Sequence, residues 1–181
     1  MADLSATTGT WAIDPTHTTI GFSARHAMVA KVRGSFTDFA GTFTLDGANP
    51  AASSAELVIQ TTSIDTGNAD RDGHLKSAEF LNVEANPTLS FTSTSVKIKN
   101  DTTFIVAGNL TLGTITKSED VTFELVGTSQ DPWGGIRIGF EGEAEISRKD
   151  FGLVWNAALE TGGVLVGDSV KITLDIEAVK Q

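Results

Sequence analysis

The sequence predicts an all-β protein, a closed antiparallel barrel of eight strands with one short helical insert at about residues 70–81. Three observations predict it. Apolar and polar residues alternate along most of the chain, turn residues separate the alternating segments, and a single charged segment interrupts them. Because successive side chains of a strand point to opposite faces, repeated alternation gives a sheet with one apolar face. Closing such a sheet into a barrel removes its unpaired edges.

The expected strands each carry a run of period-two alternation, rich in Val, Ile, Thr and Phe. Turn signals such as Asp46-Gly47 and Asp131–Gly135 lie between them. In chain order the segments cover residues 11–13, 20–26, 39–45, 57–59, 89–93, 104–112, 121–125, 136–146 and 170–176. We therefore expect eight or nine strands. No Pro/Ser-rich linker and no internal repeat divides the chain, which indicates one domain.

The inward side of this barrel mixes large and small residues. Gly41, Gly108 and Gly142 share the parity of several phenylalanines. Small residues facing large ones are compatible with tight interdigitation and equally with an open space. The interior of an eight-stranded barrel is either filled by side chains or holds one small ligand. The alternation alone leaves both interpretations open.

The charged insert contains helix formers, and Leu75 and Phe80 are available to pack inward. The same segment matches the calcium-loop spacing, with its oxygen ligands expected at Asn68, Asp70, Asp72 and Glu79 and a glycine at the sixth position. The residues before it are strand-like, whereas a calcium loop follows a helix. We therefore favour a structural helix and expect no metal site.

Composition excludes several functions. A formal net charge of −10 disfavours binding to nucleic acid or to an anionic membrane surface. The absence of cysteine excludes a thiol nucleophile and zinc–thiolate ligation. The N-terminus lacks the apolar core of a signal peptide, and no window approaches the roughly 18 apolar residues of a membrane span. We expect a cytoplasmic protein with no integral membrane insertion.

Catalytic and cofactor signatures are also missing from the sequence. His17, His26 and His74 lie in separate segments without the spacing of a zinc motif. No G-x-S-x-G elbow activates a serine, and no P-loop or G-x-G-x-x-G provides a nucleotide site. We therefore expect no catalytic residue and no cofactor.

Several blocks of the chain, in the same order, resemble the YceI-like family of polyisoprenoid-binding proteins. The blocks that carry the resemblance are residues 11–17, 20–26, 34–41, 63–66, 71–75, 80–83, 108–112, 148–152 and 166–172. The resemblance runs over about residues 10–178, leaving residues 1–9 as a short tail. It implies a lipocalin-like barrel around an elongated hydrophobic tunnel, a helix packed against the barrel, and a possible homodimer. It also implies binding of long isoprenoids or similar amphiphilic lipids without catalysis.

Two groups of residues are the candidates for ligand contact under this interpretation. Those expected to face the barrel interior are Ile20, Phe22, His26, Phe43, Phe91, Phe104, Leu110, Phe123, Ile138 and Phe140. Those expected at the mouth, partly on a lid formed by the insert, are Arg25, Arg71, Asp72, Leu75 and Phe80. Polar groups among them would fix the lipid's head group, which we expect to be of quinone or polyprenyl phosphate type.

Two other functions stay open. An enzyme of isoprenoid or small-molecule metabolism would use His26, Arg71 or Asp72 at the barrel mouth. A structural or stress-related protein would have a filled core and no physiological ligand. A bound lipid would separate the leading interpretation from the last of these.

Overall fold

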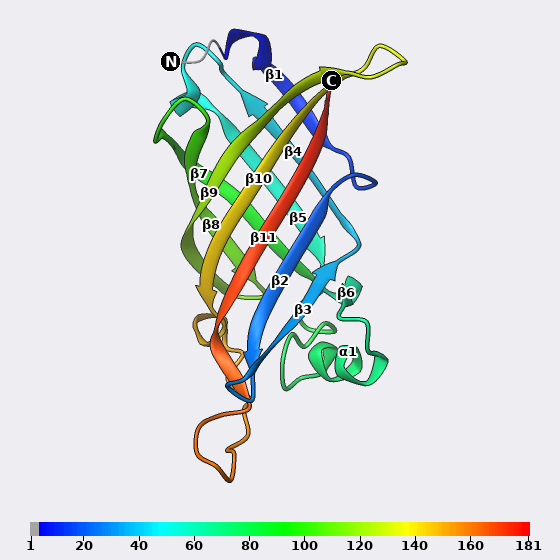
Figure 1. Ribbon diagram of the computed structural model, residues 1–181, viewed down its shortest axis with the longest axis vertical. Helices are drawn as coiled ribbons and strands as arrows, with labels where there is room; N and C mark the ends of the chain where they lie inside the picture. Colours follow the sequence, from blue (N-terminus) through cyan, green and yellow to red (C-terminus); the bar gives the residue numbers. More distant parts are fainter. Residues whose placement is uncertain (1–3) are drawn as a thin grey trace.

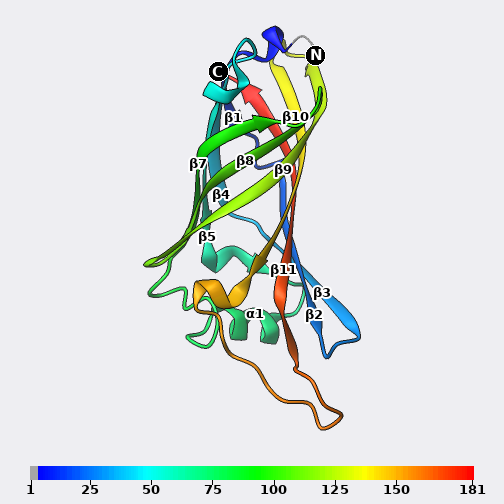
Figure 2. The same cartoon turned by 90° about the vertical axis from the view of Figure 1, so that its left-hand side faces the viewer.

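In the computed structural model, which describes residues 4–181, eleven strands form one antiparallel sheet that closes on itself (Figure 1). The strands are β1 (Gly9–Ile13), β2 (Thr19–His26), β3 (Ala30–Phe36), β4 (Phe39–Leu45), β5 (Ser54–Gln60), β6 (Ile64–Asp65), β7 (Thr88–Ile98), β8 (Thr103–Leu112), β9 (Ile115–Gln130), β10 (Ile136–Ser147) and β11 (Val166–Lys180). One α-helix, α1 (Ala69–Lys76), and short 3-10 turns complete the described chain. Both termini lie at one end, called the upper end here, and α1 lies at the lower end (Figures 1 and 2).

The eleven strands occupy eight positions around the barrel. β11 pairs with β10 on one side, and on the other its last residues pair with β1 while its first residues pair with β2. In the same way, β4 pairs with β1 and β3 pairs with β2. On the next side, β5 pairs with β4 and β6 pairs with β3. Three pairs of short strands, β1 with β2, β3 with β4 and β5 with β6, thus each occupy one position in the barrel. The closed eight-stranded antiparallel barrel predicted from the alternation is confirmed.

The break between β1 and β2 has a local cause. Pro15 has no N–H to donate to a ladder, and the chain leaves the sheet at Asp14. The hydroxyl of Thr18 bridges the interruption, since it donates to the Glu177 carbonyl and accepts from the Glu177 N–H, each at 3.1 Å. The Thr18 side chain thus joins the Asp14 N–H, which donates to the same carbonyl at 2.8 Å, in holding the break to β11.

The helix is shorter than the expected 70–81. Asn68 caps its start by accepting a hydrogen bond from the Arg71 N–H at 2.9 Å, and acidic residues follow in the first turn, where the helix dipole favours them. The helix ends at Lys76 because Ser77 turns back, with its N–H and its hydroxyl both donating to the His74 carbonyl. Residues 77–87 continue as turns. None of the described helices is long and apolar enough to cross a membrane.

The barrel interior contains two separate apolar clusters. The first, which we call the upper plug, consists of Trp11, Ile138 and Ala178, each at most 1% exposed. The Trp11 indole N–H donates to the Thr7 carbonyl at 2.9 Å, so the 3-10 turn Ser5–Thr7 is tied to the plug. Of the N-terminal tail expected over residues 1–9, residues 1–3 lie outside the described residues.

The second apolar cluster is larger and fills the lower half of the barrel. The lower end of this second cluster is closed by four residues, three of which lie outside the strands. We call these residues the lower seal. They are Ile64, Leu75, Leu81 and Phe151, carried by β6, α1, the turns after α1 and the 3-10 turn Arg148–Phe151. The barrel therefore has one end packed by strand residues and one end packed by inserted segments.

An apolar cavity as candidate functional site

An apolar cavity of about 200 Å³ lies inside the barrel, beside the plug and above the seal. Its wall is built from the inward parity of most strands, including Ile13, Ile20, Phe36, Phe43, Leu45, Leu57, Ile59, Leu89, Phe91, Val96, Phe104, Val106, Leu110, Val121, Phe123, Leu125, Phe140, Ala144, Ile146, Ile172, Leu174 and Ile176. The volume exceeds the roughly 150 Å³ of an engineered apolar cavity that binds benzene. The space is therefore large enough for a segment of an apolar chain.

Seven of the ten residues expected to face the interior line this cavity. They are Ile20, Phe43, Phe91, Phe104, Leu110, Phe123 and Phe140. Phe140 meets the rings of Phe43 and Phe123 edge to face at 5.8 and 6.3 Å between centroids. Such pairs hold aromatic side chains in defined orientations. The part of the wall built by these rings is accordingly preformed.

The other three residues do not line the cavity, although Phe22 and Ile138 do pack on apolar clusters of the interior as expected; only for His26 is an inward position wrong. His26 is exposed, because β2 runs beyond the barrel and its last residues no longer face the interior. Phe22 is half-buried against Phe36 and does not line the cavity. Ile138 has the correct parity but belongs to the plug, where Trp11 and Ala178 fill the space around it.

None of the five residues expected at the mouth lines the cavity. Arg71 and Asp72 tie α1 to the residue after β6: Arg71 Nε donates to Thr66 Oγ1 at 2.7 Å, and Asp72 Oδ1 accepts from the Thr66 N–H at 2.9 Å. Leu75 packs on the main cluster as part of the seal. Arg25 is exposed on β2.

Phe80 does not insert into the core as expected. Its ring lies 5.0 Å from His74 and 5.3 Å from Trp155, measured between centroids. His74 Nε2 in turn lies 2.5 Å from Glu79 Oε2. The residues that match the calcium-loop spacing thus lie on a helix and its following turn, with Asn68, Asp72 and Glu79 already engaged by protein groups.

The sequence reasoning missed Glu119, which lines the cavity near its lower end. Burial, with smaller contributions from Asp150 and Asp120, raises the pKa of its carboxyl group. Within the described chain no hydrogen bond or ion pair reaches this carboxyl. The signal was available, because Glu119 shares the inward parity of Val121 and Phe123 on β9.

Glu119 also marks a place where the barrel wall separates. β9 and β10 pair only between residues 122–130 and 136–143, and below this ladder β10 stays with β11 (Figure 2). Glu119 and Val121 on one strand, and Ala144 and Ile146 on the other, all line the cavity. The cavity is therefore lined, in part, by the stretch of β9 and β10 where the backbone hydrogen bonds between these two strands have ended.

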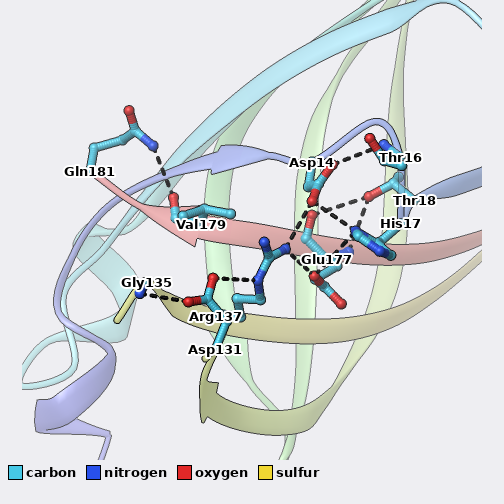
Figure 3. Close-up of polar contacts among 10 residues, drawn as sticks. All are labelled: Asp14, Thr16, His17, Thr18, Asp131, Gly135, Arg137, Glu177, Val179 and Gln181. Carbon is cyan, nitrogen blue, oxygen red and sulfur yellow. Dashed lines mark hydrogen bonds and ion pairs between the residues drawn. The ribbon is translucent and has the colours of Figure 1, made fainter. Parts of the chain in front are cut away.

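A polar cluster lies outside the plug (Figure 3). Arg137 Nη1 donates to Asp14 Oδ2 at 2.8 Å and to Glu177, and its Nε donates to Asp131 Oδ2 at 3.1 Å. His17 Nδ1 lies 2.8 Å from the same Asp14 oxygen. Hydrogen bonds from His17 and Arg137 lower the pKa of the Asp14 carboxyl group, and the carboxylates raise the pKa of Arg137.

Ligand atoms of Asp14, His17 and Glu177 lie within 4.8 Å of one another, close enough to hold a metal ion. Arg137 already binds both carboxylates, so a metal ion would have to displace a guanidinium group. We interpret the cluster as an ion-pair network that fixes the β1–β2 break against β10 and β11.

Comparison with known proteins gives consistent matches along the chain. The model of the YceI-like domain family matches residues 11–178. A UPF0312 protein of Pseudomonas aeruginosa (strain LESB58) and Protein YceI of Salmonella newport (strain SL254) are each 42% identical over 165 residues, covering 91% of this chain and 83% of the relative.

Solved structures share the fold at lower identity. BcnA of Burkholderia cenocepacia superposes with a TM-score of 0.80 at 19% identity, over 91% of this chain and 98% of that chain. A polyisoprenoid-binding domain from Saccharophagus degradans, described as implicated in plant cell wall breakdown, gives a TM-score of 0.69 at 15% identity, over 94% and 98% of the two chains. By its family match and its 42% identical relatives, the chain belongs to the YceI-like domain family.

Proposed function

We propose that the protein binds a long-chain isoprenoid or similar amphiphilic lipid in its barrel and thereby sequesters or transports it. The apolar cavity is the observation that carries this proposal. Burial of apolar surface contributes about 25 cal/mol per Å², so a lipid tail can be held with few polar contacts. The Saccharophagus degradans neighbour, described as polyisoprenoid-binding, supports the same class of ligand.

Binding accounts for the geometry better than catalysis does. The residues considered for an enzyme are dispersed, since His26 is exposed on β2 while Arg71 and Asp72 are bonded to Thr66 beside α1. No two of them meet at the cavity wall. A general acid or base must lie within hydrogen-bonding reach of the reacting group. We therefore propose a non-enzymatic role.

The charges around the cavity favour one of the two expected head groups. The ionisable residues among its described lining are Asp46, Glu56 and Glu119, with no Lys, Arg or His. Phosphate groups in proteins are held by cationic side chains or by backbone N–H groups at helix N-termini. We propose that the ligand has an uncharged head group, as a quinone or a prenyl alcohol does, in preference to a prenyl phosphate.

Filling the cavity tests the binding site. Ala144→Phe places a ring in the cavity, whereas Ala40→Phe places the same ring on the exposed side of β4. We expect the first variant to lose at least tenfold in affinity for a fluorescent prenyl probe and to release less lipid on organic extraction followed by mass spectrometry. The second variant should match the wild type. Equal binding by both folded variants would contradict the proposed site.

A competition experiment tests the head group separately. Geranylgeraniol should displace the probe at a lower concentration than geranylgeranyl phosphate, and Glu119→Gln should narrow the difference because it removes a carboxylate from the cavity wall. Equal or better competition by the phosphate would reject the uncharged head group and leave the site itself in place.

A further inference from the structure

The β2–β3 hairpin projects from the lower end of the barrel and exposes apolar residues at its tip. Met28 is 62% and Val29 is 82% exposed. The loop before β11 projects beside the hairpin and carries exposed Val154 and Val164 (Figures 1 and 2). Large apolar side chains exposed on projecting segments are typical of a surface that contacts another apolar phase.

The backbone holds these side chains in place. Ala27 and Met28 adopt φ of +49° and +64°, a region that residues with a side chain seldom occupy. The turn is closed by a hydrogen bond from the Val29 N–H to the His26 carbonyl at 3.2 Å. The Ala27 N–H donates to the Leu165 carbonyl at 2.7 Å, which ties the hairpin to the neighbouring loop. The conformation of the hairpin tip is therefore fixed by the backbone and its hydrogen bonds.

The hairpin carries a charge opposite to that of the whole protein. The chain has a net charge of −10, yet residues 15–37 contain no Asp or Glu. Arg25 lies directly opposite Lys31, and Arg33 lies opposite Ser23, so the three cations share the outer face of the hairpin. Like charges placed opposite each other across two strands are destabilising.

No part of the described chain neutralises these cations. None of the three forms an ion pair or hydrogen bond with a described residue. Two nearby carboxylates are engaged by other groups: Asp168 pairs with Lys149 at 2.8 Å, and Asp65 accepts from the Gly67 N–H at 2.7 Å; Glu160 on the neighbouring loop forms no ion pair with the three cations. A repulsive arrangement that is left unpaired points to an anionic partner outside the chain.

Apolar tips flanked by Lys and Arg are the signature of segments that bind at a membrane surface, where the apolar side chains enter the headgroup region and the cations meet lipid phosphates. We propose that the β2–β3 hairpin docks the lower end of the barrel on an anionic lipid bilayer. Met28 and Val29 enter the headgroup region, and Arg25, Lys31 and Arg33 lie on lipid phosphates. This surface is distinct from the cavity, and its docking does not require that the cavity hold a lipid.

The upper end supplies matched controls. Trp133 is 88% exposed at the tip of the β9–β10 hairpin, and Lys97 and Lys99 are exposed near the β7–β8 turn. Arg25→Gln/Lys31→Gln and Lys97→Gln/Lys99→Gln change the net charge equally. In the same way, Met28→Ser/Val29→Ser and Trp133→Ser both remove exposed apolar surface from a hairpin tip.

The measurement is flotation of the full chain with phosphatidylcholine vesicles that contain or lack about one-third phosphatidylglycerol, at low and high salt. Wild-type protein should bind the anionic vesicles and be released by salt, which screens charge. Each cation near such a surface changes affinity about fivefold, so Arg25→Gln/Lys31→Gln should weaken binding roughly thirtyfold. Met28→Ser/Val29→Ser should also weaken binding, and both upper-end controls should bind like the wild type.

Three results would overturn docking by this hairpin. The first is no binding to anionic vesicles at low salt, which would leave an acidic macromolecule as the partner of the cations. The second is equal binding to neutral and anionic vesicles. The third is an equal loss in the lower-end and upper-end double lysine or arginine variants, which would indicate an effect of net charge alone.

Discussion

The two ends of the barrel are closed in different ways. At the upper end, Trp11, Ile138 and Ala178 come from strands that pair with one another, so the plug belongs to the ladder itself. At the lower end, Leu75, Leu81 and Phe151 come from segments that follow or interrupt strands. The residues that pack the upper end thus belong to hydrogen-bonded strands, whereas most residues that pack the lower end belong to segments outside the strands.

This difference predicts which end can open. Moving a plug residue breaks the hydrogen bonds of its strand, while segments outside a ladder open locally at lower free energy. The lower seal nevertheless has its own fastening in Arg148, which is 4% exposed. Its guanidinium donates to the carbonyls of Gly167, Leu153, Trp155 and Val166. The seal is thus closed in the present structure, and Arg148 joins it to β11 by side-chain hydrogen bonds.

The largest expected effect belongs to the plug. Ile138→Ala removes a side chain that is 1% exposed and should lower the free energy of unfolding by about 2–5 kcal/mol. Val126→Ala on the exposed side of β9 should cost almost nothing. Urea unfolding of the two variants measures the difference. A loss below about 1 kcal/mol for Ile138→Ala would mean that Ile138 is not tightly packed in the plug.

A smaller effect on stability, with a kinetic consequence, is expected at the seal. Leu75 is only partly buried, so Leu75→Ala should cost about 1–2 kcal/mol, less than a full core truncation. Loosening α1 should speed the release of a bound prenyl probe, as expected if the insert acts as a lid, while Ile138→Ala should not. Stopped-flow dissociation of the probe measures both. Unchanged release with a large loss of global stability would make α1 part of the core.

The smallest effect concerns the polar cluster outside the plug. Because Asp14 has a lowered pKa in the folded state, its charge stabilises the fold above the unfolded pKa of about 3.9, and this contribution is lost as pH falls through and below that value. Asp14 lies near the surface, so the contribution should be at most about 1 kcal/mol. Thermal unfolding between pH 6 and 3 should show a shallower acid limb for Asp14→Asn. Parallel curves for the two proteins would show that the Arg137 network does not depend on this carboxylate.

Alternation predicted the barrel and most of its inner face, because side-chain direction in a strand follows directly from parity. It could not separate Ile138 from Phe140, which share one strand and one parity while one lies in the plug and the other lines the cavity. That distinction depends on Trp11 and Ala178, which are distant in sequence. The prediction that His26 faces the interior was wrong for another reason. At its position β2 extends beyond the barrel, so the inward parity no longer points into an interior.

The insert illustrates the limit of spacing arguments. Asn68, Asp72 and Glu79 have the spacing of a calcium loop, but in the structure each is engaged by a nearby residue of the same segment or its flank. Glu119 is the opposite case, because it is an acidic residue that lies among apolar neighbours on the inward side of β9 and lines the cavity. A charged residue on the inward parity of a strand is therefore a more informative signal of a functional site than a match to a ligand spacing.

The pairing of β11 with β1 and β2 has a consequence for synthesis on the ribosome. Most other ladders join strands that are close in sequence, whereas this one joins residues 166–180 to residues 11–26. Until β11 has left the exit tunnel, the growing chain can form only an open sheet with two unsatisfied edges and an uncovered apolar face. The nascent protein thus passes its most aggregation-prone stage just before the last strand arrives, and chaperones that shield sheet edges would act in that interval.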